Sequence, residues 1–454
     1  RSVRKANWAA LPADVQDENL DLIFAQAMWR HGDRAPEHAV PGCDKFQFSE
    51  DDWTFGGGGY GELSPEGMKM HFNLGRKLRE RYITKIFPGF VSKAYNAKEI
   101  YIRSTDFNRT LISAYANLQG MFSGNGEADK NYPTDVPEWP TNYVPIPVHT
   151  VALNTDFFGR PDTKCARQDQ LYDMIKQNVE YQAYSNDHQV SQLLKYLSDE
   201  TGTEVNVDNI YELENPLFCE KTHIEDLNGI GANISDLYPW FYTGEVESMV
   251  EWVLDKHEQF TDGTGNPNGV NGIDISVEIP KIRAGETLKS LVGNIHGVLK
   301  CKEDENAYSC RKFYRKLRYY ALSAHDTTLS AFLTILGVKK YVVPEGYPNY
   351  SAAILLEVYQ EKTTNEKYFK VLYHAGVDDT GKPITAFVRG CDITSSICPI
   401  AVLDDLVAKY SPDTDMATLC ATPPDGAPPA STTATAKPVD GASTTTTFTS
   451  TTTK

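Results

Sequence analysis

The sequence lacks the features that mark several classes of protein. It contains no run of about 18 apolar residues, so no segment is predicted to cross a membrane as a helix. It has no C-x-x-C pair, which argues against a zinc cluster, and we expect neither a metal nor another cofactor. Basic residues are in deficit, and the net charge of −17 argues against nucleic acid as a partner, because a phosphate backbone is bound through a basic face.

The cysteines and the glycosylation sequons indicate an oxidising compartment. Eight cysteines are spread along the 454 residues and favour disulfide bonds. Sequons at Asn233 and Asn349 predict N-glycosylation and agree with secretion. The chain begins without an apolar signal segment. We therefore expect a mature ectodomain that is secreted, displayed on the cell surface or located in the lysosomal lumen.

The first candidate site follows an apolar stretch near the N-terminus. Residues 22–29 predict a buried strand, which runs into the polar loop R-H-G-D-R-A-P of residues 30–36. An anion bound by Arg30 and Arg34 would bring its phosphorus or sulfur within reach of His31. This pattern indicates a nucleophile that handles phosphate. The alternative interpretation is a loop at a strand end with solvated charges.

A second basic stretch, residues 99–110, reads E-I-Y-I-R-S-T-D-F-N-R-T. Its pattern predicts a short strand that passes into a helix. The N-terminus of a helix favours anions through its free N–H groups, and an arginine in the first turn adds a bidentate donor for phosphoryl oxygens. Arg109 has this position. Arg103 is more simply explained as a structural ion pair with Asp106.

The third stretch, residues 317–328, again reads as a strand followed by a loop and a helix. His325 and Asp326 come directly after the predicted strand. Ligands of open α/β sheets bind at the carboxyl ends of the strands, so these side chains are expected at the same edge as His31. Taken alone, Asp326 would be interpreted as a helix N-cap with an incidental histidine before it.

Together the three stretches resemble the motifs of the histidine acid phosphatases, the prostatic and lysosomal acid phosphatase branch of the histidine phosphatase superfamily. The matching patterns are R-H-G-x-R-x-P at 30–36, R-S-T-D-x-x-R-T at 103–110 and S-A-H-D-T-T at 323–328. The resemblance implies hydrolysis of phosphate monoesters through a phosphohistidine. It implies that the nucleophile is His31, that the proton donor is Asp326, and that phosphate is bound by Arg30, Arg34, Arg109 and His325.

The resemblance also implies an α/β fold, in which a mixed β-sheet core is flanked by helices and carries an inserted, mostly helical cap. We expect the core in residues 19–156 and 301–420 and the cap in residues 157–300. Residues 421–454 are rich in Thr, Ser and Pro and predict a disordered stalk. Within the cap, hydrophobic periodicity predicts helices at 170–182, 190–199, 205–213 and 244–260.

The disulfide pattern is partly implied by the same resemblance. It implies the pairs Cys165–Cys420 and Cys391–Cys398. Cys301 and Cys310 are close enough in sequence to pair locally. The sequence departs from the family at Cys219, because the expected partner on the strand near residues 350–355 is missing. By exclusion, Cys43 is left to pair with Cys219.

We therefore expect a secreted or surface acid phosphatase with a broad range of phosphate monoester substrates. Its pH optimum should be acidic, because Asp326 must carry a proton to donate it, whereas its arginine neighbours favour the carboxylate. One alternative is an inositol polyphosphate phosphatase, although Asp33 beside the site and the net charge of −17 would repel a polyanion. The other alternative is a secreted glycoprotein that keeps the fold but binds a partner. The stalk predicts that the full product continues past Lys454 into a membrane anchor, with a soluble secreted enzyme as the alternative, and a homodimer is left open.

Overall fold

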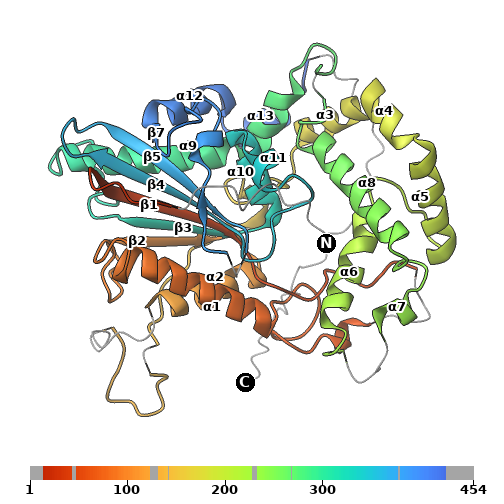
Figure 1. The fold of residues 1–454 in the computed structure, drawn as a ribbon, viewed down its shortest axis with the longest axis horizontal. Coiled ribbons are helices and arrows are strands. Elements are labelled where there is room, and N and C mark those ends of the chain that lie inside the picture. Colours follow the sequence, from red (N-terminus) through yellow and green to blue (C-terminus); the bar gives the residue numbers. More distant parts are fainter. Residues whose placement is uncertain are drawn as a thin grey trace, which may run out of the picture.

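The computed structural model of the chain describes residues 14–42, 48–122, 131–141, 143–227, 233–266, 268–376 and 379–425. Helices cover both faces of its sheet, and a further group of helices lies beside it (Figure 1). The strands are β1 (Leu20–Arg30), β2 (Ile100–Ser104), β3 (Tyr319–Ala324), β4 (Ala353–Glu361), β5 (Lys367–His374), β6 (Lys382–Pro383) and β7 (Cys398–Pro399). The helices are α1 (Pro65–Arg79), α2 (Asn108–Phe122), α3 (Ala166–Lys176), α4 (Val179–Ser185), α5 (His188–Thr201), α6 (Ile210–His223), α7 (Ile234–Leu237), α8 (Glu245–Thr261), α9 (Ile275–Glu303), α10 (Asp326–Leu336), α11 (Lys339–Val342), α12 (Ile400–Tyr410) and α13 (Met416–Ala421).

The sheet is mixed, with the strand order β2-β3-β1-β4-β5-β6, and β7 pairs with β5. β1 and β2 run parallel to β3, whereas β4 to β7 are antiparallel to their neighbours. Trp29 of β1 and Ser104 of β2 are both in register with Ser323 of β3. The carboxyl ends of the three parallel strands therefore meet at one edge of the sheet, which confirms the α/β expectation.

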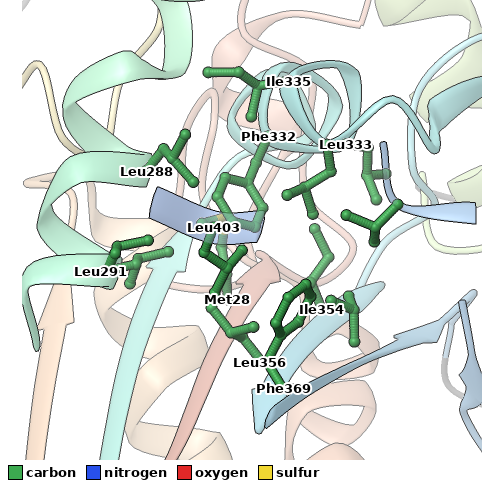
Figure 2. Packing of buried hydrophobic residues seen from close by; sticks show 14 of the residues in the cluster. Met28, Leu288, Leu291, Phe332, Leu333, Ile335, Ile354, Leu356, Phe369 and Leu403 are labelled. Atoms are coloured by element: carbon green, nitrogen blue, oxygen red, sulfur yellow. The ribbon is translucent and has the colours of Figure 1, made fainter. Parts of the chain in front are cut away.

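The side chains of β1 alternate between two apolar clusters, one on each face of the sheet. Phe24 and Met28 pack with residues of α9, α10 and α12, as Figure 2 shows around Met28. Ala25, Ala27 and Trp29 belong to the cluster formed with α1 and α2. Because both faces of the strand are covered, its sequence is an almost continuous apolar run rather than an alternating one.

The start of α1 packs against the loop that follows β1. Ser64 caps this helix by accepting a hydrogen bond from the N–H of Gly67 at 3.0 Å, and Pro65 occupies the first helical position. A Cβ atom on Gly32 would collide with the backbone of Gly67. Glycine is therefore required at position 32 by the close approach of α1.

Helices α3 to α8 form a separate group beside the sheet (Figure 1). They pack on one another around an apolar cluster of their own. The group contains the expected helices at 190–199 and 244–260 as α5 and α8, and the expected helix at 170–182 is divided into α3 and α4.

Two helices differ from the sequence expectation. α6 begins only at Ile210, because Val205 and Val207 are buried in the preceding turn and imitate the apolar face of a helix. Periodicity does not predict α9, because its sequence contains Pro280 and its buried residues lie on most sides of the helix. The first turns of α9 pack in the helical group and the later turns pack on the sheet. The boundary between cap and core, expected at residue 300, therefore falls inside α9.

The structure contains the disulfides Cys165–Cys420, Cys301–Cys310 and Cys391–Cys398. The expected pair of Cys43 with Cys219 is not formed, since Cys219 is a buried free thiol of α6 whose Sγ lies 3.9 Å from Nη1 of Arg34. Cys43 itself lies outside the described residues, as does the predicted stalk after residue 425. None of the helices in the described ranges has the length and apolar character needed to span a membrane.

Candidate active site

His31 lies in the loop directly after β1 and is only 2% exposed. A carbonyl oxygen can only accept, so the 2.8 Å contact between Nδ1 of His31 and the Gly32 oxygen places a proton on Nδ1. Burial, followed by the charges of the nearby arginines, holds the pKa of His31 well below its usual value. The ring is therefore neutral, and its Nε2 atom carries a free lone pair.

Arg30, the last residue of β1, is fixed by three contacts. Its Nη1 donates to the carbonyl oxygen of Pro348 at 2.7 Å. Its guanidinium lies over the ring of Tyr350, 4.2 Å from the ring centroid. Its Nη2 forms an ion pair of 2.8 Å with the carboxylate of Asp326. These contacts orient the guanidinium before any ligand binds.

Arg34 and Arg109 share the carboxylate of Glu37. The Oε1 atom of Glu37 lies 2.7 Å from Nη2 of Arg109 and 3.5 Å from Nη2 of Arg34. Arg34 also donates to the carbonyl oxygen of Ala35 at 2.9 Å. The guanidinium of Arg109 lies 4.6 Å from the centroid of the Phe107 ring. The second motif therefore places Arg109 beside Arg34 of the first motif.

Three guanidinium donors in this site have no partner. Within the described part of the chain, the Nε atoms of Arg30, Arg34 and Arg109 are buried without a hydrogen bond. Two arginines elsewhere share this feature, but the charges of these three act on His31 and lower its pKa. A buried unpaired donor costs free energy. Convergent guanidinium groups beside a neutral imidazole fit a phosphoryl ligand.

His325 caps α10, and its ring centroid lies 5.7 Å from that of His31. The Thr110 hydroxyl donates to the Thr105 carbonyl at 2.9 Å, so the Thr105 hydroxyl donates to Thr110 and accepts from Nε2 of His325, each at 2.9 Å. Burial and the charges of Arg109 and other arginines hold the pKa of His325 well below its usual value. The neutral ring thus keeps its proton on Nε2, directed to Thr105.

Asp326 is the first residue of α10. Its Oδ1 accepts from the backbone N–H of Thr327 at 2.7 Å, and its Oδ2 pairs with Arg30 at 2.8 Å. The side chain is 21% exposed, unlike buried His31. Partial exposure at the edge of an anion site is suitable for a group that protonates a departing alcohol.

The expected pairing of Arg103 is wrong. Arg103 forms an ion pair of 2.5 Å with Asp156 rather than with Asp106. The reason is that Asp156 is fully buried beside the end of β2, whereas Asp106 is exposed to solvent. Arg103 is therefore structural, as expected, but through a different carboxylate.

Asp33 is not the carboxylate that faces the arginines. It accepts a hydrogen bond from the Ser64 hydroxyl, and its Oδ2 lies 2.6 Å from Nε2 of His223 in α6. The carboxylates that pair with Arg30, Arg34 and Arg109 are those of Asp326 and Glu37. In the described ranges, no three His, Cys, Asp or Glu side chains are grouped in a way that could hold a metal ion.

Comparisons with known proteins identify the family of the chain. A family model described as the histidine phosphatase superfamily (branch 2) matches residues 21–374. The chain belongs to this superfamily. "Putative acid phosphatase 10" of Caenorhabditis elegans is 32% identical over 416 residues, which are 90% of this chain and 96% of the relative. Lysosomal acid phosphatase of Rattus norvegicus is 33% identical over 356 residues, which are 77% of this chain and 70% of the relative. The apo phytase of Hafnia alvei shares the fold with a TM-score of 0.57 and 13% identity, covering 90% of this chain and 100% of that chain.

The motifs of this histidine phosphatase do not reveal every side chain of the site. Sequence reasoning missed Glu37, Thr105, Arg160, Tyr211 and Tyr350. Glu37 directly follows the first motif, and Thr105 lies inside the second, so proximity to a motif was the available signal. Tyr211 comes from α6, is 41% exposed, and lies within range of the charges of Arg34 and Asp326. The helical group carries no motif that would have indicated it.

Proposed function

We propose that this histidine phosphatase hydrolyses phosphate monoesters through a phosphohistidine on His31. The observation that carries the proposal is the free Nε2 of a neutral histidine beside three arginines with unpaired Nε donors. Arg30, Arg34 and Arg109 would neutralise the equatorial phosphoryl oxygens, a task that Mg²⁺ performs in kinases. Relatives named as acid phosphatases support the same reaction.

The reaction proceeds in two steps. In the first, Nε2 of His31 forms a bond to phosphorus, and the bond to the leaving oxygen breaks as Asp326 gives that oxygen a proton. In the second, water attacks the phosphohistidine and gives a proton to Asp326, while the electron pair of the broken bond returns to Nε2. One ester and one water become an alcohol and a phosphate, and no metal is required.

Two contacts change when a phosphoryl group binds. The ion pair of Arg30 with Asp326 opens, so that the carboxyl group can carry a proton. Nε2 of His325 is bonded to Thr105, and the ring caps α10 toward the N–H of Thr328, so one of these bonds is exchanged for a contact to phosphate. The negative charge of the ligand favours a proton on the ring. Because both changes involve binding of a proton, an acidic pH optimum is expected.

We also propose that the enzyme is secreted or located in the lysosomal lumen. Disulfides and relatives named lysosomal acid phosphatase support secretion or the lysosomal lumen. The helical group would act as a cap through α6, whose Asn215 lies 3.4 Å from Arg34. Asn233 and Asn349 are exposed, which suits glycosylation. Homodimer formation and anchoring beyond Lys454 stay predictions.

The experiment measures phosphate release from p-nitrophenyl phosphate between mildly acidic and neutral pH, with and without EDTA. The wild type should turn over in both conditions, and His31→Ala should not. Turnover by His31→Ala would contradict a histidine nucleophile. Loss of wild-type activity in EDTA alone would indicate a metallophosphatase, and no turnover at any pH would favour a binding protein.

A further inference from the structure

The carboxylate of Glu37 pairs with two of the proposed phosphate-binding arginines. Oε1 of Glu37 lies 2.7 Å from Arg109 and 3.5 Å from Arg34. The Glu37 side chain is 42% exposed, whereas those of Arg109 and Arg34 are 12% and 2% exposed, so Glu37 approaches from the solvent side. Burial opposes ionisation of Glu37, but the charges of Arg34 and Arg109 outweigh it and hold its pKa below the usual value. The group is therefore a carboxylate.

Two carboxylates offset half of the positive charge around the active-site histidines before substrate binds. The charges that act on His325 come from four guanidinium groups, those of Arg30, Arg34, Arg109 and Arg160. The carboxylates of Asp326 and Glu37 pair with three of these groups. One phosphoryl group is enough to balance the positive charge that is left. A second anionic group would find little unpaired positive charge and would experience the field of Glu37.

We infer that Glu37 is a specificity-determining residue, which disfavours phosphate monoesters whose leaving group carries further negative charge. The inference rests on the proposed phosphatase function and names its substrate class. When a phosphoryl group binds Arg34 and Arg109, their interaction with Glu37 weakens, but the carboxylate stays at the entrance of the site. It then repels a carboxylate or a second phosphate on the leaving group. Neutral and cationic leaving groups are accepted, and inositol polyphosphates are poor substrates.

The test uses two aryl esters that differ in one charge, phenyl phosphate and 4-carboxyphenyl phosphate. kcat/KM is measured for both esters with the wild type, with Glu37→Gln and with the control Glu62→Gln. Glu62 has the same charge in a neighbouring loop, but it accepts from Asn108 at 2.7 Å rather than from an arginine. The intrinsic reactivity of each ester cancels when the enzymes are compared, so the ratio of the two kcat/KM values reports the effect of charge.

Glu37→Gln should raise the ratio of kcat/KM for 4-carboxyphenyl phosphate to that for phenyl phosphate by about tenfold. Glu62→Gln should change the ratio by less than about twofold, because the Glu62 carboxylate is bound by Asn108 and not by a site arginine. A structural role of Glu37 alone would lower both kcat/KM values together and leave the ratio unchanged. An unchanged ratio in Glu37→Gln, or an equal rise in both variants, would overturn the inference.

The outcomes for the inference and for the proposed function are separable. If the wild type hydrolyses both esters and the ratio does not respond to Glu37→Gln, the inference fails and the phosphatase function stands. If the wild type hydrolyses neither ester, the proposed function fails. Calorimetric titration with inorganic phosphate then tests Glu37 without turnover. Glu37→Gln should bind phosphate more tightly than the wild type, and equal affinity would overturn the inference.

Discussion

Arg30 and Asp326 form an ion pair of 2.8 Å that joins the end of β1 to the start of α10. The two residues are far apart in sequence, but Arg30 is in register with Ala324 at the end of β3. The parallel pairing of β1 with β3 therefore brings the first and third motifs together. The same ion pair holds Asp326, the proposed proton donor, against Arg30, a proposed phosphate-binding residue. Proton transfer by Asp326 and phosphate binding by Arg30 therefore depend on each other.

The role of Asp326 predicts a dependence on the leaving group. Asp326→Asn should lower kcat/KM for alkyl phosphates by about 10²- to 10⁴-fold, because an alkoxide is a poor leaving group without a proton. The loss for p-nitrophenyl phosphate should be much smaller, because p-nitrophenolate leaves readily. Steady-state kinetics with both esters measures the difference. An equal loss for the two esters would remove Asp326 from the acid role.

The convergence of the arginines predicts a large effect at Arg109. Arg109→Ala should lower kcat/KM by about 10²- to 10³-fold, because a preorganised donor to the transition state is lost. The matched control is Arg167→Ala. Arg167 is similarly exposed, at 14% against 12%, and forms an ion pair of 2.8 Å with Glu278 away from the site. Similar losses in the two variants would show that the effect is structural.

The contact between α6 and the loop after β1 predicts a change of stability with pH. His223 lies 2.6 Å from Asp33 and 3.1 Å from Asp226. Burial lowers the pKa of His223, but the two carboxylates outweigh burial and raise it above the usual 6.5. Because the folded protein favours the protonated ring, this contribution is complete below pH 6.5 and is lost as the pH rises through the folded-state pKa.

The measurement is the free energy of unfolding of the wild type and of His223→Gln across a pH series. At low pH the variant should be less stable by about 1.5–3 kcal/mol, the value of a hydrogen bond to a charged group. The difference should decrease at alkaline pH. A difference that is constant with pH would show that charge on His223 does not stabilise the contact.

The disulfides predict unequal losses of stability. Cys165–Cys420 spans 255 positions, whereas Cys391–Cys398 spans 7. In the loop-entropy account, removing the long link by alanine substitution should cost ~5 kcal/mol and removing the short one ~2.5 kcal/mol. Unfolding curves in non-reducing buffer measure both losses. A larger loss for the short link would contradict this account.

The position of the site at one edge of the sheet could be predicted from sequence, because each of the three motifs follows a strand of its own. The apolar run of residues 22–29 indicates β1, and the residues that follow each parallel strand carry His31, Arg109 and Asp326. Ends of parallel strands meet at one edge, so placing these side chains together needed only the topology. The proposed catalytic groups were therefore accessible to sequence reasoning.

The contacts between motifs could not be predicted in the same way. Asp33 was expected to act on substrate, but it binds His223, which lies far along the chain in α6. The carboxylate shared by Arg34 and Arg109 is that of Glu37, and no spacing rule connects it to Arg109. α9 escaped prediction because it is covered on one side by the helical group and on another by the sheet, which removes the periodicity. Such contacts depend on tertiary packing and not on local pattern.

The proposed mechanism requires that His31 becomes phosphorylated during turnover. The most direct test is to mix Asp326→Asn with excess p-nitrophenyl phosphate, quench in base, in which phosphohistidine persists, and locate the modification by peptide mass spectrometry. p-Nitrophenyl phosphate needs no acid to phosphorylate the enzyme. Hydrolysis of the phosphohistidine, in contrast, is slowed without Asp326, so the phosphoenzyme should accumulate. We expect one phosphoryl group on His31, and this group should be lost on acidification. A phosphoryl group on any other residue, or turnover without a phosphoenzyme, would contradict the proposed mechanism.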